Sequence, residues 1–308
     1  MSIYTPAEVL ECIRQGASLE KAELAHVELQ GLDLDGADFS RAYMRVANLE
    51  RASCKKTNFS GTVLIRGRLL EAMLIGADLA QAQLTAARLE RANLREAHFE
   101  GARLFGAVLD DADATSAVFD RANLEDCSGR QATLRLAQFV KTRLVASDWA
   151  SANFASASLH GAILDGANFS RATLVGTQLD RAQLVRTRLV AASLNSATLI
   201  GATLVEVDAE GADFTSAELD TAIANCARAP HANFTNASLF GSSWNSAVLT
   251  EANFEGANLV DASFENANFE GATLVDADVR GATFTDAVGL TKAQKQELRA
   301  RGALNVPV

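Results

Sequence analysis

Proline, cysteine and histidine are scarce in this chain, and it contains no long apolar run. The 308 residues include 3 prolines, of which only Pro230 lies between the chain ends. Ordinary loops and linkers between domains are rich in proline, so a conventional multidomain enzyme is not expected. No stretch of eighteen apolar residues occurs, and the start MSIYTPAEVLECIRQ lacks the basic lead and apolar core of a signal peptide. We therefore expect a cytoplasmic protein with no membrane partner.

The cysteines and histidines are too scattered to form a site. The 4 cysteines are Cys12, Cys54, Cys127 and Cys226, and the 4 histidines are His26, His98, His160 and His231. No CxxC pair is present, and no histidine lies at a spacing that would pair it with a serine or carboxylate as a triad. We predict no disulfide framework, metal, cofactor or catalytic residue. Cys54 and Cys127 are expected to be buried, and Cys226 to face outward.

What the sequence does contain is a strict period of five. With 48% hydrophobic and 21% charged residues, a disordered chain is not expected. From Leu19 to Phe284 there are 54 pentads centred on residue numbers ending in 4 or 9, and 48 centres are Leu, Phe, Met, Trp or Val. The position two before the centre is alanine in 42 of the 54. The six small centres are Cys54, Ala114, Gly129, Ala209, Ala224 and Ala229.

A period of five fits neither a continuous helix nor a continuous strand. Apolar residues recur every 3.6 positions in a helix and every 2 in a strand. In an extended chain the alanine and the centre point the same way, but the next centre, an odd number of residues later, would point the opposite way. A turn in every pentad keeps all centres inside, so the chain is predicted to wind as a solenoid. Glycine at positions such as Gly36, Gly76 and Gly106 suits these corners.

The repeats resemble those of the pentapeptide-repeat family, whose motif A(D/N)LxX is seen in GADLAQ at 76–81, GANFSR at 166–171 and EANFEGANLV at 251–260. The resemblance covers about residues 17–286. It implies an all-β fold, a right-handed quadrilateral β-helix with four pentads per coil and residues twenty apart stacked on each other. Trp149 follows Gly129 by twenty, and Trp244 follows Ala224 by twenty. Each indole is therefore expected to fill the space left by a small centre one coil earlier.

Solenoid ends need caps, and both ends carry helix signals. Thr5, Pro6 and Glu8 predict the start of a capping helix within residues 1–16, ending at Gly16. The repeat domain is assigned to residues 17–289. Residues 290–308 form the second predicted cap, where KAQKQELRAR follows Thr291 and precedes Gly302. Each cap is expected to be an end plug, with homodimerisation through an end cap as the alternative.

Charge is uneven along the chain. Residues 1–188 carry 22 Lys+Arg and 23 Asp+Glu, and residues 189–308 carry 6 and 15, so the net charges of −1 and −9 add to the formal −10. For the gyrase-directed members of the family that this chain resembles, the proposed mechanism is imitation of duplex DNA by an acidic rod. Here the thirteen acids of residues 189–279 divide four, two, four and three among the four sides. Because no side is favoured, a solubilising surface is preferred over mimicry.

One side of the predicted solenoid combines arginines with outward apolar residues, a composition typical of protein interfaces. The candidate partner surface consists of Arg45, Ile65, Arg66, Arg103, Phe105, Arg143, Val145, Val185 and Arg186. Solvated arginines and β-branched residues that merely favour extended chain are the competing explanation. The register contains no insertion, so the loops projecting from quinolone-resistance members have no counterpart. The small centres make residues 207–230 the one perturbed stretch, where thinner coils or a slight bend are expected.

The interpretation that follows is a non-catalytic bacterial scaffold that mediates protein–protein interaction. Residues 4–39, from Tyr4 to Phe39, also resemble the start of pentapeptide modules associated with bacterial type VI secretion loci. The alternative function is a DNA-mimicking modulator of DNA gyrase or another topoisomerase, and direct nucleic-acid binding is not expected. A hollow for several reacting groups is not expected in a solenoid packed with Leu and Phe, so an enzyme is the least favoured class.

Overall fold

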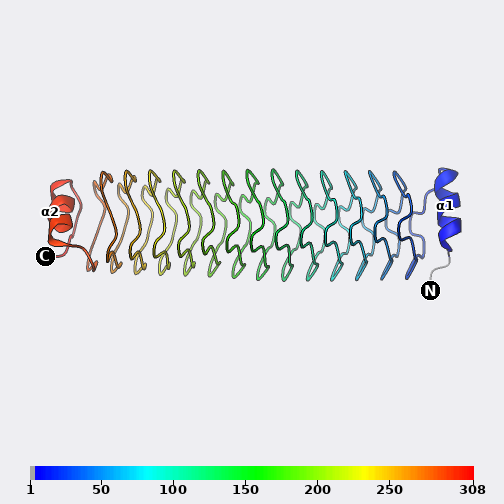
Figure 1. The fold of residues 1–308 in the computed structure, drawn as a ribbon, viewed down its shortest axis with the longest axis horizontal. Coiled ribbons are helices and arrows are strands. Elements are labelled where there is room, and N and C mark those ends of the chain that lie inside the picture. Colours follow the sequence, from blue (N-terminus) through cyan, green and yellow to red (C-terminus); the bar gives the residue numbers. More distant parts are fainter. Residues whose placement is uncertain (1–3) are drawn as a thin grey trace. The chain divides into compact units, whose positions relative to one another are not determined.

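The computed structural model describes residues 4–308, so the first three residues of the predicted cap lie outside the described part. Helix α1 spans Pro6–Arg14 and helix α2 spans Lys292–Ala300 (Figure 1). The chain divides into two compact units, Met1–Ser158 and Leu159–Val308, and each unit is described by itself. Within residues 4–308 no helix is both long and apolar enough to cross a membrane.

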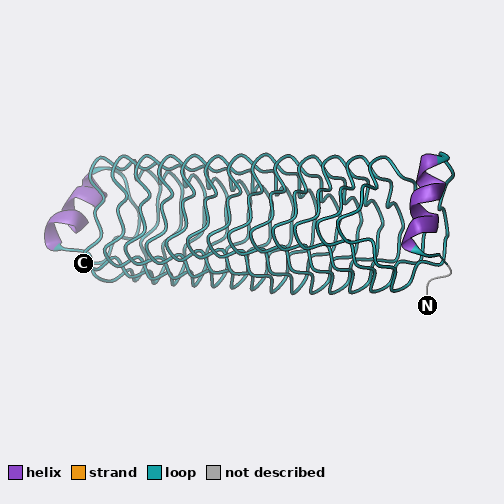
Figure 2. Ribbon diagram, turned by 45° about the vertical axis from the view of Figure 1, so that its right-hand side comes forward, coloured by secondary structure: helices purple, strands orange, loops and turns teal. Residues whose placement is uncertain are grey.

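In each unit the chain between the helices winds in coils of twenty residues, four pentads to a coil (Figure 2). Residues whose numbers end in 3 or 8 form parallel bridges with the residue twenty further on, as in Tyr43 with Val63 and Ile223 with Ser243. Each bridge involves a single residue on either side because a corner follows at once. The all-β class and the four-sided coil predicted from the sequence are confirmed.

The interior of each unit is filled by the pentad centres and by the small residues two positions before them, which are buried. Phenylalanines twenty apart stack face to face. Ring centroids are 4.7 Å apart for Phe99 and Phe119, and 4.8 Å apart for Phe119 and Phe139. In the second unit Phe234 continues a similar stack with centroid distances of 4.9 Å on both sides. Such pairs contribute roughly 0.5–1.5 kcal/mol each beyond simple burial.

Every corner uses the left-handed backbone conformation. All residues whose numbers end in 1 or 6, from Gly16 to Asp286, have φ between 53° and 71°. Glycine adopts this conformation without steric cost, so its prediction at the corners is confirmed. Most corners nevertheless carry other residues, including the β-branched Val46 and Thr221. Glycine is therefore favoured there, but the packed interior fixes the conformation whatever the side chain.

The backbone hydrogen bonds explain why Asp or Asn precedes so many centres. In residues 57–61 the amide of Thr57 closes the turn, and three other amides donate to neighbouring coils at 2.7–2.9 Å. The remaining amide, of Ser60, donates to the side-chain Oδ1 of Asn58 at 3.0 Å. In some pentads that lack such a side chain, an aspartate or asparagine of the preceding coil accepts instead, as Asp120 does from Val140 at 2.9 Å. The acidic residues thus have a structural use in the repeat.

Both end helices begin as the sequence predicts. The amide of Glu8 donates to Thr5 Oγ1 at 3.3 Å and the amide of Thr5 donates to Glu8 Oε2 at 2.7 Å, a reciprocal capping box. Thr291 and Gln294 form the same pair of bonds at the start of α2. Gly16, with φ of 67°, follows the last turn of α1. These bonds satisfy amides that a helix start otherwise leaves free.

Residues 207–230 keep the register of the second unit. Asp208 pairs with Arg228 and Asp213 with Asn233, again twenty residues apart. The small centres Ala209, Ala224 and Ala229 are fully buried, like the large ones. The stretch expected to be perturbed therefore has the same coil length and bridge spacing as its neighbours.

Candidate protein-binding surface

The two units divide the candidate partner surface. Residues from Arg45 to Val145 belong to the first unit, and Val185 and Arg186 belong to the second. Phe105 is 45% exposed, and Arg103 on the same coil is exposed too. The aliphatic members are half-buried: Ile65, Val145 and Val185. Phe105 is therefore the most prominent apolar group of this set.

Ion pairs separate the arginines of the surface into two groups. Arg143 pairs with Glu125 Oε1 through both Nε and Nη2. Arg186 Nε lies 3.8 Å from Glu206 Oε2 in the second unit. Among the described residues, Arg45, Arg66 and Arg103 have no carboxylate within ion-pair distance. These three guanidinium groups are available to another molecule, whereas Arg143 and Arg186 already have partners.

Arg103 and Phe105 project from one coil on either side of the buried Leu104. Alternate residues of extended chain point to opposite faces, so both side chains face away from the interior. Arg103 forms a bridge with Asn123, which in turn forms a bridge with Arg143. The first unit thus exposes a basic group and an aromatic ring two residues apart on one coil.

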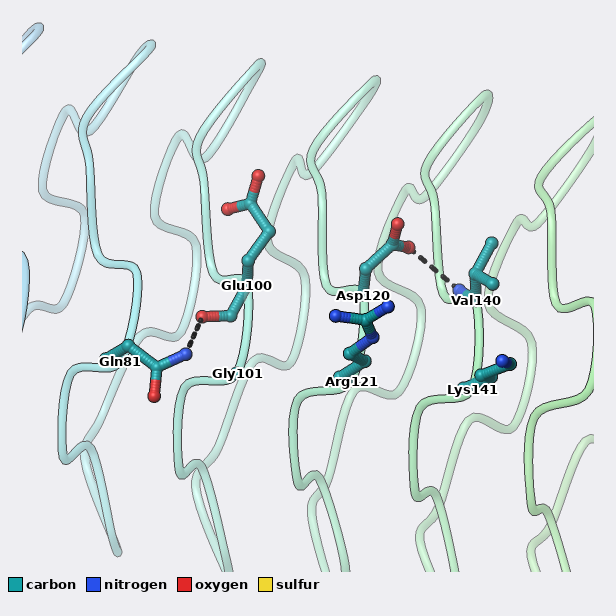
Figure 3. Close-up of a pocket in the computed structure, with 7 residues that line it drawn as sticks. All are labelled: Gln81, Glu100, Gly101, Asp120, Arg121, Val140 and Lys141. Carbon is teal, nitrogen blue, oxygen red and sulfur yellow. Dashed lines mark hydrogen bonds between the residues drawn. The ribbon is translucent and has the colours of Figure 1, made fainter.

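A hollow of about 350 Å³ adjoins this face at Gly101, two residues before Arg103 (Figure 3). It is lined by Gln81, Glu100, Gly101, Asp120, Arg121, Val140 and Lys141. The side-chain Nε2 of Gln81 extends over Gly101 and donates to the backbone oxygen of Glu100 at 3.2 Å. Sequence reasoning missed Arg121 and Lys141. Both residues lie at multiples of twenty positions after Gln81, so the stacking period would have placed them in one row with Gln81 and Gly101.

The predicted packing of the tryptophans holds at Gly129. Trp149 and Trp244 are buried, and the ring of Trp149 fills the space in which a side chain of Gly129 would begin. The indole Nε1 of Trp149 donates to Ser147 Oγ at 2.7 Å, and that of Trp244 donates to Ser242 Oγ at 3.1 Å. Among the 54 pentads, only these two have serine two positions before the centre. Sequence reasoning missed these acceptors, although the coincidence was visible.

The repeat itself has known relatives. A family model described as pentapeptide repeats matches residues 12 to 286, apart from short gaps at 145–151, 190–191 and 224–231. The chain belongs to the pentapeptide-repeat family. Its fold is accordingly the right-handed β-helix that the sequence predicts. Among curated protein sequences none matches this one significantly.

Three solved structures are among those similar to this chain. HetL from the cyanobacterium Nostoc sp. strain PCC 7120, involved in regulating heterocyst differentiation, is 27% identical over 92% of this chain and 97% of its own, with a TM-score of 0.33. A thylakoid-lumen protein of Arabidopsis thaliana is 28% identical over 32% of this chain and 68% of its own, with a TM-score of 0.32. QnrB1, a plasmid-mediated fluoroquinolone resistance protein, is 18% identical over 74% of this chain and 95% of its own, with a TM-score of 0.47.

Many acids of this pentapeptide-repeat chain are engaged within their own unit. Burial alone would raise the pKa of Asp213, but hydrogen bonds from Thr215, Asn195 and Asn233 outweigh it and lower the pKa below its ordinary value. Of the thirteen acids in residues 189–279, seven bind a backbone amide, an arginine or a histidine. They are Glu206, Asp208, Glu210, Asp213, Asp220, Glu251 and Asp278.

The thiols and histidines do not converge on a site. Burial raises the pKa of Cys54 well above its ordinary value, and it raises that of Cys127 to about 12. Both thiols are therefore protonated and unreactive at neutral pH. Cys226 is exposed, as expected. His98 Nδ1 lies 3.3 Å from Glu100 Oε1, and within residues 4–308 no three His, Cys, Asp or Glu side chains are grouped to hold a metal ion.

Proposed function

We propose that this chain is a non-catalytic scaffold of the bacterial cytoplasm that binds a protein partner through the first unit. The observation that carries the proposal is the pairing of Arg103, which has no carboxylate partner in the described part of the chain, with Phe105, which is 45% exposed on the same coil. Arginine and aromatic residues are enriched where proteins bind proteins, and a few such residues dominate binding energy. Members of this family are generally non-enzymatic proteins that serve in structure or interaction.

The interior supports binding rather than catalysis. Each unit is filled by leucine, phenylalanine and alanine side chains, so reacting groups would have to assemble on the outside. The hollow at Gly101 is open, and the residues that line it include no serine, threonine, cysteine or histidine that could act as a nucleophile or base. A rigid surface of this kind recognises other molecules by shape and charge.

The alternative, a DNA-mimicking modulator of gyrase, is less well supported. A carboxylate held against a backbone amide, such as Asp213 or Asp220, stands close to the coil instead of projecting as a phosphate does. Glu210 and Asp208 are drawn to Arg228. Mimicry needs acids concentrated in ridges, and more than half of those in residues 189–279 serve the unit itself.

The resemblance of the first repeats to modules of type VI secretion loci leads us to propose a component of such a locus as the partner. The neighbouring genes provide an inexpensive check. Secretion genes beside this one would favour the assignment, and their absence from related genomes would remove it.

Affinity capture from the native bacterium, followed by mass spectrometry, tests the main proposal. The double variant Arg103→Glu with Phe105→Asp should lose the captured protein, because both substituted side chains face outward and the interior is unchanged. A control with the same change of charge on other surfaces, Arg95→Glu with Phe240→Asp, should retain it; Arg95 and Phe240 are both exposed. Equal capture by both variants would remove this face from consideration.

A further inference from the structure

We infer that the hollow beside Gly101 receives the carboxylates of an acidic segment of the partner protein. The inference rests on the proposed function, since it names the chemistry of the partner at the surface proposed above. Two bases line the hollow, Arg121 and Lys141, on the two coils that follow the coil of Gly101, and Arg103 lies two residues after Gly101 in the chain. Below, Arg121 and Lys141 are called the basic pair.

The basic pair is not neutralised, and both of its members line the hollow. Several other arginines of the first unit bind glutamates of their own or neighbouring coils, as Arg51 does to Glu71 at 2.8 Å and Arg88 to Glu90 at 2.9 Å. Arg121 and Lys141 are exposed, and within residues 4–308 neither has a carboxylate at ion-pair distance. They occupy equivalent corners one coil apart, about 4.8 Å by the usual spacing of paired strands. Two carboxylates of one segment can reach both.

Gly101 opens the space that these carboxylates would enter. The row of corner residues twenty apart runs Gln81, Gly101, Arg121, Lys141, and the missing side chain at Gly101 leaves the floor of the hollow bare apart from the amide of Gln81 (Figure 3). That amide bonds the backbone oxygen of Glu100. A side-chain amide and two bases together offer hydrogen-bond donors, which is what a carboxylate requires.

The two acids that line the hollow are directed to one side of this row of corner residues (Figure 3). Asp120 accepts the amide of Val140 at 2.9 Å, so it serves the backbone. Glu100 Oε1 lies 3.3 Å from His98 Nδ1, and its Oε2 is enclosed without a hydrogen-bond partner in the described part of the chain. Glu100 therefore opposes a bound carboxylate by like-charge repulsion. Removing its charge should strengthen the binding that loss of the basic pair weakens.

Besides carboxylates, the partner segment is expected to carry an apolar residue that contacts Phe105. Phe105 lies four positions after Gly101, so the two are at most about 13 Å apart along the chain. An acidic segment with an apolar residue within that distance would contact both. Nucleic acid fits less well: residues 1–158 carry 18 Lys+Arg against 21 Asp+Glu, a net charge of −3, and a duplex would extend its phosphates over these acids.

Panning a display library of random twelve-residue peptides against the full-length protein tests the inference while the partner is still unidentified. We expect enriched peptides with two neighbouring Asp or Glu and an apolar residue several positions away. Arg121→Glu with Lys141→Glu should weaken their binding, measured by fluorescence anisotropy, about tenfold or more. Glu100→Gln should tighten it. Arg95→Glu with Arg135→Glu, which makes the same change of charge at exposed positions elsewhere in the first unit, should leave it unchanged.

Other outcomes overturn the inference. Two of them concern the library: enrichment of neutral or basic peptides, or no enrichment at all. The third is an equal loss of peptide binding in the control variant. The fourth is a twenty-base-pair DNA duplex that binds more tightly than the peptides and depends on the basic pair. Unfolding midpoints of all variants are compared first, and Arg121→Gln with Lys141→Gln replaces the reversal if that variant is unstable. If partner capture depends on Phe105 but acidic peptides do not bind, the inference fails while the proposed function stands. If acidic peptides bind but capture is indifferent to Phe105, the proposed function fails instead.

Discussion

The indole of Trp149 lies against the α-carbon of Gly129, one coil earlier on the same side of the first unit. Its Cζ3 and Cε3 atoms occupy the space that a β-carbon at residue 129 would need. The largest side chain of the interior is thus accommodated by the complete absence of one beneath it. Close packing requires this pairing, because neither a void nor an overlap is tolerated in a filled interior.

Gly129→Ala is expected to lower the free energy of unfolding by about 1–3 kcal/mol, because the added methyl group overlaps the indole. Trp149→Ala should cost about 3–5 kcal/mol through the cavity it leaves. Urea unfolding measures both.

The double substitution Gly129→Leu with Trp149→Leu restores the leucines found at the preceding centres of this side, Leu89 and Leu109. It should be less destabilised than Trp149→Leu alone. Additive costs would mean that the two residues do not share a volume.

Ser147→Ala should destabilise the protein by about 1–3 kcal/mol, because it leaves the buried Nε1 of Trp149 without its acceptor. Ser242→Ala provides an independent repeat of the test at Trp244. In the variant Ser147→Ala with Trp149→Phe no indole remains to be satisfied, and the cost of the serine change should vanish. A cost that persisted would assign the serine another role.

The sequence predicted the fold because the period of five leaves one solution: a corner in every pentad with all centres inside. It also predicted the pairing of Trp149 with Gly129, because stacking at twenty residues converts sequence spacing into contact. The hollow at Gly101 escaped notice for a physical reason. Arg121 and Lys141 are exposed bases like Arg95 and Arg135, and whether a surface base meets a carboxylate or borders a hollow depends on side-chain directions that the repeat pattern does not specify.

Val46→Gly is expected to raise the free energy of unfolding by about 1 kcal/mol, because valine at φ of 58° crowds its β-branched side chain against the backbone. Gly36→Ala is the reverse test. Nothing lies within 4 Å of the β-carbon that it would add, so its expected cost of about 1 kcal/mol comes from the backbone alone. Destabilisation by Val46→Gly would show that the packing of the half-buried side chain outweighs the strain.

Stability should fall in acid partly through Asp213. Its pKa in the folded protein is lower than the ordinary 3.8, so its carboxylate contributes stability above that pH and loses it as the pH falls through the folded value. In Asp213→Asn the free energy of unfolding should decline less between about pH 5 and pH 2. Asn233 accepts the amide of Thr235 at 3.1 Å in the same way one coil later, so the substitution keeps the turn. An unchanged decline would contradict the assignment.

The last prediction concerns topoisomerases. At concentrations near that of the enzyme, the wild-type protein should have little effect on DNA supercoiling by gyrase. An imitation of duplex DNA needs free carboxylates at regular spacing along a ridge, because the enzyme binds phosphates by position. Here Asp213 and Asp220 are held by backbone amides, and Glu210 and Asp208 are partly neutralised by Arg228. The acids that remain in residues 189–279 belong to all four sides. Supercoiling assays with increasing protein measure the effect directly, and strong inhibition at equimolar protein would place mimicry ahead of the scaffold.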